Sequence, residues 1–184
     1  MIMRVIMSRI IRLISLALLL SLTTSLCAVD FNKDGNSDLV FKTTDGYLKT
    51  WGMDSSYGKT EHWLTNLGSD NWKVFVNAGD LDNDGNPDIL IQDETTGYIQ
   101  VIQMNGFSKV ALKWVGNPGG SEWQVKGTAD IDSNGYPDII LQNSTNGYIK
   151  AYKLSASFTA TIQWIGNPNG VDWSIKDIAD VDGD

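Results

Sequence analysis

After residue 28, the apolar residues fall in short runs separated by turn residues, and no stretch repeats with the 3.6-residue period of a helix. Within residues 80–129 this pattern predicts four strands, at 88–92, 98–104, 109–115 and 123–128. Turn formers separate these strands, at Thr96-Gly97, Asn105-Gly106 and Asn117-Pro118-Gly119-Gly120. Both faces of the 98–104 strand carry apolar residues, which predicts a small sheet packed between two neighbouring sheets.

The whole pattern recurs at a period of 50 residues, which Asp30, Asp80, Asp130 and Asp180 mark. The segments DFNKDGNSDLVF, DLDNDGNPDILI and DIDSNGYPDIIL begin at the first three of these aspartates, and a pair of tryptophans follows each. Four strands in a repeat of this length are typical of a β-propeller blade. The sequence therefore predicts an all-β fold with propeller-type blades of four antiparallel strands, in three full repeats plus the start of a fourth.

Three full repeats are fewer than the roughly 4–8 blades of most propellers. We favour an incomplete propeller from a truncated reading frame, because the sequence stops at Asp184 inside an acidic segment. Self-assembly with copies of the same chain and an open stack of blades are the alternatives.

Residues 1–28 have the composition of a secretory signal peptide: three arginines, an apolar run at 13–22, then small polar residues. The run is shorter than the roughly 20 residues that span a bilayer, so we expect cleavage near residue 28 and no stable membrane span. An uncleaved anchor and lipid attachment at Cys27 are alternatives, and the bulky Leu26 disfavours the second. The expected location is secreted, either extracellular or periplasmic, with residues 29–184 as the repeat region.

The expected mature chain is strongly acidic. Three of the 14 basic residues precede residue 29, so 11 remain against 22 acidic residues, a net charge of −11. None of those 11 is an arginine. Because phosphate recognition uses clustered lysine and arginine, this composition excludes nucleic acid as a partner class. Acidic residues at this density repel one another unless a cation neutralises them.

Three loops share the form D-x-[DN]-x-[DN]-G-x-x-D, which sets side-chain oxygens at alternate positions of a tight turn. The glycine supplies backbone angles that other residues rarely adopt. Calcium takes about 6–8 such oxygens and tolerates irregular geometry, so we predict about three Ca²⁺ sites. The alternative is that these residues only form turns. The predicted side-chain ligands are Asp30, Asn32, Asp34 and Asp38; Asp80, Asp82, Asp84 and Asp88; Asp130, Asp132, Asn134 and Asp138; and Asp180, Asp182 and Asp184 of a fourth loop. The predicted backbone-carbonyl ligands are Asn36, Asn86 and Tyr136.

The segment GDLDNDGNPDILIQDETTGYIQVIQMNG, residues 79–106, resembles the FG-GAP or VCBS-type repeat of integrin-alpha-like propellers and of many secreted bacterial proteins. The resemblance covers essentially residues 29–184, although the fourth repeat stops before its glycine and final aspartate. It implies calcium held as a structural brace in the loop between consecutive strands. It also implies a role in adhesion, ligand binding or carbohydrate recognition.

Each repeat carries two tryptophans and an asparagine around a flexible turn, an arrangement that resembles the sugar site of some propeller lectins. We favour the alternative that the tryptophans are wedged between blades, where large flat side chains seal the stack. The candidate ligand-binding residues are Trp63, Asn66, Trp72, Trp114, Asn117, Trp123, Trp164, Asn167 and Trp173.

Residues for common catalytic chemistries are scarce. His62 is the only histidine and Cys27 the only cysteine, so nucleophilic triads and histidine-ligated zinc sites lack their usual residues. We therefore predict a non-enzymatic, secreted calcium-binding module for adhesion or protein binding, with an extracellular protein or carbohydrate as partner. A lectin-like propeller is the first alternative and a hydrolase fragment the second.

Overall fold

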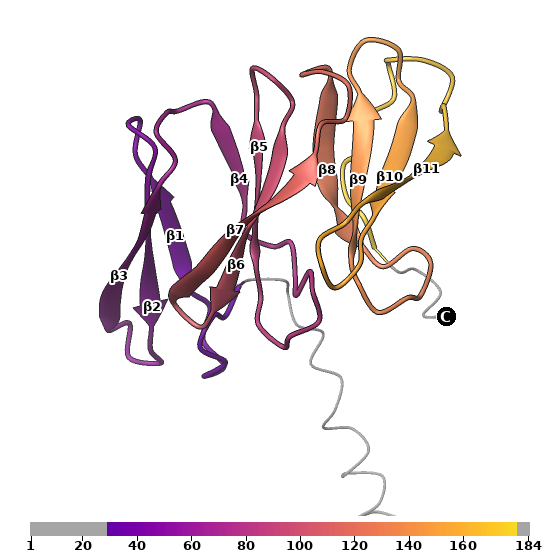
Figure 1. Ribbon diagram of the computed structural model, residues 1–184. Helices are drawn as coiled ribbons and strands as arrows, with labels where there is room; N and C mark the ends of the chain where they lie inside the picture. The colour runs from indigo at the N-terminus through magenta and orange to yellow at the C-terminus, as the bar shows by residue number, and fades with distance from the viewer. Residues whose placement is uncertain (1–28, 180–184) are drawn as a thin grey trace, which may run out of the picture.

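The computed structural model describes residues 29–179 (Figure 1). The predicted signal peptide and the predicted ligands Asp180, Asp182 and Asp184 lie outside this range. The described part contains eleven strands and no helix, so it also contains no helix that could cross a membrane. The strands are β1 (Leu39–Lys42), β2 (Tyr47–Met53), β3 (Lys59–Asn66), β4 (Trp72–Phe75), β5 (Ile89–Asp93), β6 (Ile99–Asn105), β7 (Ser108–Gly116), β8 (Trp123–Ala129), β9 (Asp138–Asn143), β10 (Ile149–Lys153) and β11 (Thr161–Gly166).

The strands form three antiparallel sheets that follow chain order: β1-β2-β3, β4-β5-β6-β7 and β8-β9-β10-β11. Each sheet is a meander in which sequential strands pair, and Figure 1 shows the three sheets side by side like blades. This arrangement confirms the predicted all-β fold with propeller-type blades. No sheet closes on itself within residues 29–179.

The sheets differ from the sequence repeats in one respect. The strand predicted at 123–128, the last of its repeat, is β8 and opens the next sheet, where it pairs with β9. In the same way β4, at the end of the first repeat, pairs with β5. The acidic segment between each such pair acts as a hairpin loop, which folds the strand before it onto the strand after it. The 80–88 and 130–138 loops therefore each lie within one sheet, and each four-stranded sheet takes its first strand from the preceding repeat.

The core consists of two apolar layers between the three sheets. One layer, between the first and second sheets, contains Phe31, Ile89 and Met104. The other, between the second and third sheets, contains Leu90 and Phe158. Ile89 and Leu90 are neighbours on β5, are both fully buried, and belong to different layers. Since successive side chains of a strand point to opposite faces, this confirms the predicted packing of one sheet between two neighbouring sheets, in this case the second sheet.

Glutamine side chains join the second and third sheets to the segments that follow them. The Gln92 amide of β5 donates to the Trp123 carbonyl at 2.6 Å and accepts from the Val125 N–H at 2.9 Å. Gln142 of β9 makes the same two bonds, to the Trp173 carbonyl at 2.7 Å and from the Ile175 N–H at 3.0 Å. Both amides are buried, and each makes the two hydrogen bonds that a backbone N–H and carbonyl would make to a neighbouring strand.

Candidate metal centre

The acidic loops 30–38, 80–88 and 130–138 share one backbone fold. In the second loop the Asp80 carboxylate accepts hydrogen bonds from the Asp84 N–H at 3.1 Å and the Gly85 N–H at 2.6 Å. Gly85 has a φ of 90°, a left-handed conformation that strains residues other than glycine. The first and third loops repeat these bonds and this angle, which confirms the predicted role of the glycine.

The ninth residue of each loop is a buried aspartate. Asp88 is fully buried, and its two oxygens accept from the Leu81 N–H at 3.1 Å and the Met104 N–H at 2.9 Å. It thereby ties the start of the acidic loop to the end of β6. Asp38 and Asp138 hold the equivalent positions with the equivalent bonds. Burial raises the pKa of Asp88 to about 7, and it also raises the pKa values of the other two.

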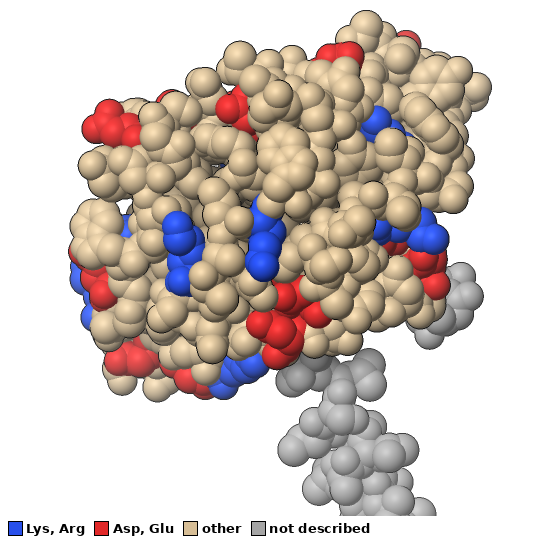
Figure 2. Space-filling view, viewed as in Figure 1, with Lys and Arg blue, Asp and Glu red and all other residues tan. Residues whose placement is uncertain are grey.

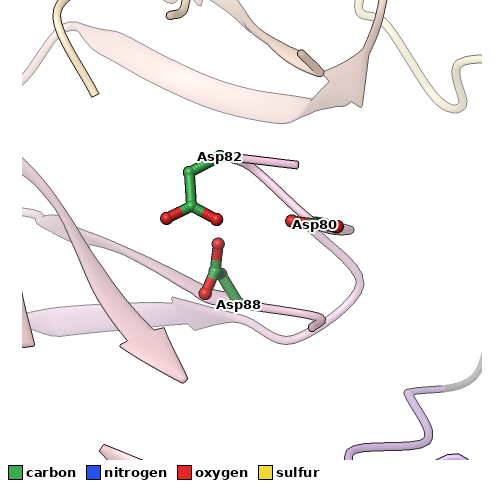
Figure 3. A group of neighbouring side chains, drawn as sticks. All are labelled: Asp80, Asp82 and Asp88. Atoms are coloured by element: carbon green, nitrogen blue, oxygen red, sulfur yellow. The ribbon is translucent and has the colours of Figure 1, made fainter. Parts of the chain in front are cut away.

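Two of the three loops gather three carboxylates around one point. Asp80, Asp82 and Asp88 each place one oxygen within 4.8 Å of the others, and Figure 3 shows Asp82 and Asp88 facing each other with Asp80 to one side. A second group has the same geometry and consists of Asp130, Asp132 and Asp138. Since calcium binds oxygens at about 2.3–2.6 Å, oxygens on opposite sides of one ion lie about 5 Å apart. The spacing and the all-oxygen donor set fit a hard divalent cation.

The 30–38 loop is arranged differently. Its third position is Asn32, whose amide nitrogen donates to the Asp34 carboxylate at 2.9 Å. Within residues 29–179 no group of three acidic side chains gathers at this loop. A calcium site there, with Asp30, Asn32, Asp34 and Asp38 as ligands, stays a prediction.

The fifth loop positions stand outside the two groups of three carboxylates. The side-chain oxygens of Asp34, Asp84 and Asn134 each accept the backbone N–H two residues further on, at 2.8 Å. This local turn uses one side-chain oxygen of each residue to satisfy the backbone. Asp84 still lies near the group, since its charge helps to raise the pKa values of Asp82 and Asp88. The N–H groups that donate belong to Asn36, Asn86 and Tyr136, whose carbonyls stay predicted ligands.

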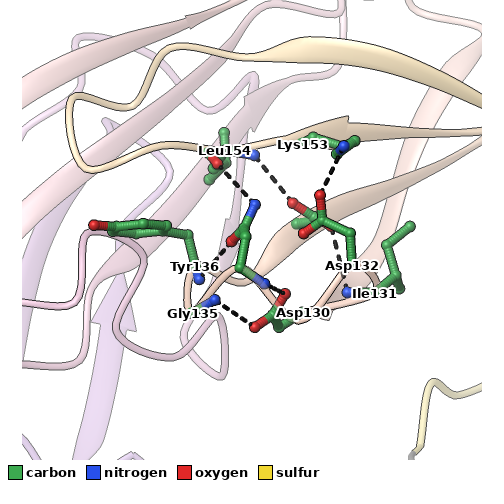
Figure 4. Close-up of polar contacts among 9 residues, drawn as sticks. Asp130, Ile131, Asp132, Gly135, Tyr136, Lys153 and Leu154 are labelled. Atoms are coloured by element: carbon green, nitrogen blue, oxygen red, sulfur yellow. Dashed lines mark hydrogen bonds and ion pairs between the residues drawn. The ribbon is translucent and has the colours of Figure 1, made fainter.

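Two residues that the sequence analysis did not single out contact the clusters from the neighbouring hairpin. Gln103 on β6 donates to an Asp82 oxygen at 2.6 Å. Lys153 on β10 forms an ion pair with Asp132 at 2.7 Å, and this pair lowers the pKa of Asp132 (Figure 4). Both lie directly before the residue whose N–H donates to the last aspartate of their loop, a position that Gly52 holds in the first repeat. The repeat alignment would have matched them to each other, but only strand pairing places them over the loop.

All three acidic loops lie at one edge of the stack, the lower edge in Figure 1. The face seen in Figure 2 carries acidic patches along that same edge. The structure therefore repeats the candidate site along one side of the molecule.

This loop-and-strand unit matches a known repeat. The profile of the FG-GAP-like repeat fits residues 30–91 and, again, residues 80–141. The chain belongs to the FG-GAP-like repeat family. Each FG-GAP match begins at the first aspartate of one acidic loop and ends in the strand that follows the next loop. No curated protein and no solved structure matches the chain.

The candidate ligand-binding tryptophans of this FG-GAP-like chain fall into two classes. Trp63, Trp114 and Trp164 are exposed, and each lies on the third strand after its loop. The second class consists of the second tryptophan of each repeat. Trp123 is buried in the layer between the second and third sheets, and Trp72 is half-buried. The third member of this class, Trp173, is exposed.

The asparagines predicted beside these tryptophans shape the turns. The side-chain oxygens of Asn66, Asn117 and Asn167 accept from the backbone N–H groups of Gly68, Gly119 and Gly170, at 2.7, 2.8 and 2.8 Å. Those oxygens are therefore engaged within the protein, and the exposed tryptophan rings are the part of the predicted site that faces solvent.

Proposed function

We propose that the chain is a secreted, calcium-braced binding module and not an enzyme. Its membership of the FG-GAP-like repeat family supports a repeat module for binding. The single observation that carries the calcium proposal is the gathering of three carboxylates in two loops, one carboxylate of each group being fully buried. A buried carboxylate is costly unless a cation or a proton neutralises it.

The residues suited to hold the ions are Asp80, Asp82 and Asp88 in one loop and Asp130, Asp132 and Asp138 in the other. A bound calcium ion would supply positive charge to these carboxylates. Asp88 already accepts hydrogen bonds from the Leu81 and Met104 N–H groups, so a cation beside it would offset the cost of its buried charge and stabilise the fold in which the loop is joined to β6. Bound calcium would make the edge of the stack that carries the acidic loops rigid, and this edge would present the surface that binds the partner.

Calcium titration of the chelator-stripped protein, purified after expression of the complete chain, tests the proposal. We expect calorimetry to show uptake of at least two ions, and three when the 30–38 loop also binds. The melting temperature should rise with calcium, because a ligand of the native state stabilises it. An Asp45→Asn variant is the matched control, since Asp45 is exposed and lies outside the acidic loops. Absence of both heat and stabilisation would refute the calcium proposal.

The two carboxylate groups should differ in affinity. The Lys153 ammonium forms an ion pair with Asp132, whereas the side chain that donates to Asp82 from the neighbouring hairpin is the neutral Gln103 amide. We expect Lys153→Gln to tighten binding at the 130–138 loop several-fold, because the ion no longer competes with a fixed positive charge. The reciprocal Gln103→Lys should weaken binding at the 80–88 loop. Calorimetric Kd values for both variants check this, and unchanged values in both would contradict it.

Carbohydrate recognition is the second candidate function, and exposed aromatic pairs favour it. Trp114 meets Tyr98 edge to face with ring centres 4.9 Å apart, and Trp164 meets Tyr148 in the same way at 6.3 Å. All four rings are exposed, and aromatic faces are the usual platforms for sugar rings. Glycan-array binding that Trp114→Ala and Trp164→Ala abolish would establish a lectin. Binding to cell-surface proteins without glycan dependence would establish adhesion through protein.

A further inference from the structure

The first sheet has one strand fewer than the other two. The second and third sheets open with β4 and β8, which pair with β5 and β9. The equivalent of β5 and β9 in the first sheet is β1, and within residues 29–179 its second edge has no strand partner. An unpaired edge offers a row of backbone donors and acceptors to another strand.

The other end of the stack holds a strand segment without a sheet. Residues 173–176 read WSIK, and the equivalent segments WKVF and WQVK form β4 and β8. The Gln142 amide holds Trp173 and Ile175 by the same two bonds through which Gln92 holds β8. The segment thus occupies the place of an opening strand, but no described strand pairs with it.

The side chains around that segment form a C-terminal face, made of Ile131, Ile165 and Trp173. The equivalent residues of the second repeat lie in the layer between the second and third sheets. Ile165 is 51% exposed, whereas its counterpart Val115 is 8% exposed. Trp173 is 65% exposed, and Trp123 is 7% exposed.

The C-terminal face also includes Ile131, which is exposed although its counterparts Phe31 and Leu81 are buried. All three residues of the face therefore lack the cover that one more sheet would provide.

The first sheet presents the complementary N-terminal face, made of Leu39, Phe41, Trp51, Met53 and Tyr57. The equivalent residues of the second and third sheets all pack toward the preceding sheet. Leu39 is 46% exposed, whereas its counterparts Ile89 and Ile139 are fully buried.

Tyr57 shows the same contrast at the hairpin tip. It is almost fully exposed, whereas its counterpart Phe158 in the third sheet is buried against the second. The two end faces therefore carry the same kinds of residues as the two surfaces that pack against each other between neighbouring sheets.

We propose that the N-terminal face of one copy docks on the C-terminal face of a second copy, and that β1 of the first pairs with residues 173–176 of the second. The β4–β5 and β8–β9 registers place Ser174 opposite Lys42 and Ile175 opposite Phe41. The contact is head-to-tail, and the described residues of two copies contribute six sheets, which is within the range of about 4–8 blades of closed propellers. A closed pair covers both faces of both copies.

The mass of the protein in solution, measured by light scattering after gel filtration of the purified complete chain, tests this docking. We expect a dimer, and we expect Leu39→Lys and Ile165→Lys each to yield monomers. The controls place lysine at positions of similar exposure whose counterparts in the other repeats are also exposed, and which therefore lie outside the sheet-to-sheet contact. They are Tyr47→Lys (46% exposed; Tyr98 39%, Tyr148 47%) and Ile162→Lys (56% exposed; Leu112 48%). Both controls should stay dimeric, and circular dichroism verifies the fold of all four.

Mixing the two monomeric variants distinguishes head-to-tail docking from any other dimer. Each variant keeps one intact face, so Leu39→Lys and Ile165→Lys should form a one-to-one complex with each other. A monomeric wild type would overturn the proposal and leave a different partner on both faces. A dimer that neither substitution disrupts, or a mixture that stays monomeric, would also overturn it. These results do not depend on calcium uptake, so the calcium proposal stands or falls separately.

Discussion

Replacing Asp88 by alanine should lower the free energy of unfolding by about 2–5 kcal/mol, since two buried N–H groups lose their acceptor and a cavity remains. Asp88 is fully buried, and it alone joins the Leu81 N–H of the acidic loop to the Met104 N–H at the end of β6. The loss corresponds to a melting temperature lower by roughly 10 °C for a domain of this size. Denaturant unfolding monitored by tryptophan fluorescence measures it.

Asp84→Ala is the control for this substitution. Asp84 is exposed, lies four residues earlier in the same loop, and accepts hydrogen bonds only from Asn86. Its removal should change the free energy of unfolding by no more than about 1 kcal/mol. Equal effects of the two substitutions would show that Asp88 acts only as one more acidic loop residue.

In the presence of a chelator, the protein should become less stable as the pH rises from about 4 to about 7. Burial raises the pKa of Asp88 from 3.8 in the unfolded chain to about 7 in the folded one, so in this interval the folded state holds a proton that the unfolded state has released. Raising the pH therefore favours unfolding until both states are ionised. Asp38 and Asp138 shift in the same direction.

Calcium should reverse this pH dependence, because the ion binds ionised carboxylates and stabilises the folded state more as they lose their protons. Melting temperatures measured from pH 4 to pH 8, with chelator and with calcium, check the prediction. Asp88→Asn should reduce the slope with chelator, since the titrating group is absent. A melting temperature that rises with pH in chelator would contradict the assignment of Asp88 as a buried, uncompensated carboxylate.

The sequence pattern predicted the strands well because turn residues mark their ends. The strand expected at 98–104 is β6, Ile99–Asn105, and the one expected at 109–115 is β7, Ser108–Gly116. It did not show which sheet the 123–128 strand joins. A strand followed by an acidic loop has the same local pattern whether it closes one sheet or opens the next, and only the hairpin pairing of β8 with β9 decides this.

The candidate site, like the fold, could be predicted in part from the sequence. The alternating oxygens of the motif pointed to convergence, and the structure gathers the first, third and ninth positions, such as Asp80, Asp82 and Asp88. The fifth position turns to the backbone, which spacing alone does not indicate because the same residue type serves both roles. Lys153 was missed because it lies on β10, and only the pairing of β10 with β9 brings it to Asp132 of the acidic loop.

The offset between repeats and sheets has a consequence for how the protein unfolds. Since β4 and β8 belong by sequence to one repeat and by pairing to the next sheet, the repeat boundaries and the sheet boundaries are out of phase. A repeat that unravels takes with it the opening strand of its neighbour, and Gln92 or Gln142 loses its partners at the same time. We therefore expect disorder that begins in one repeat to spread to the adjacent sheet, and the array to melt as one cooperative unit and not one repeat at a time.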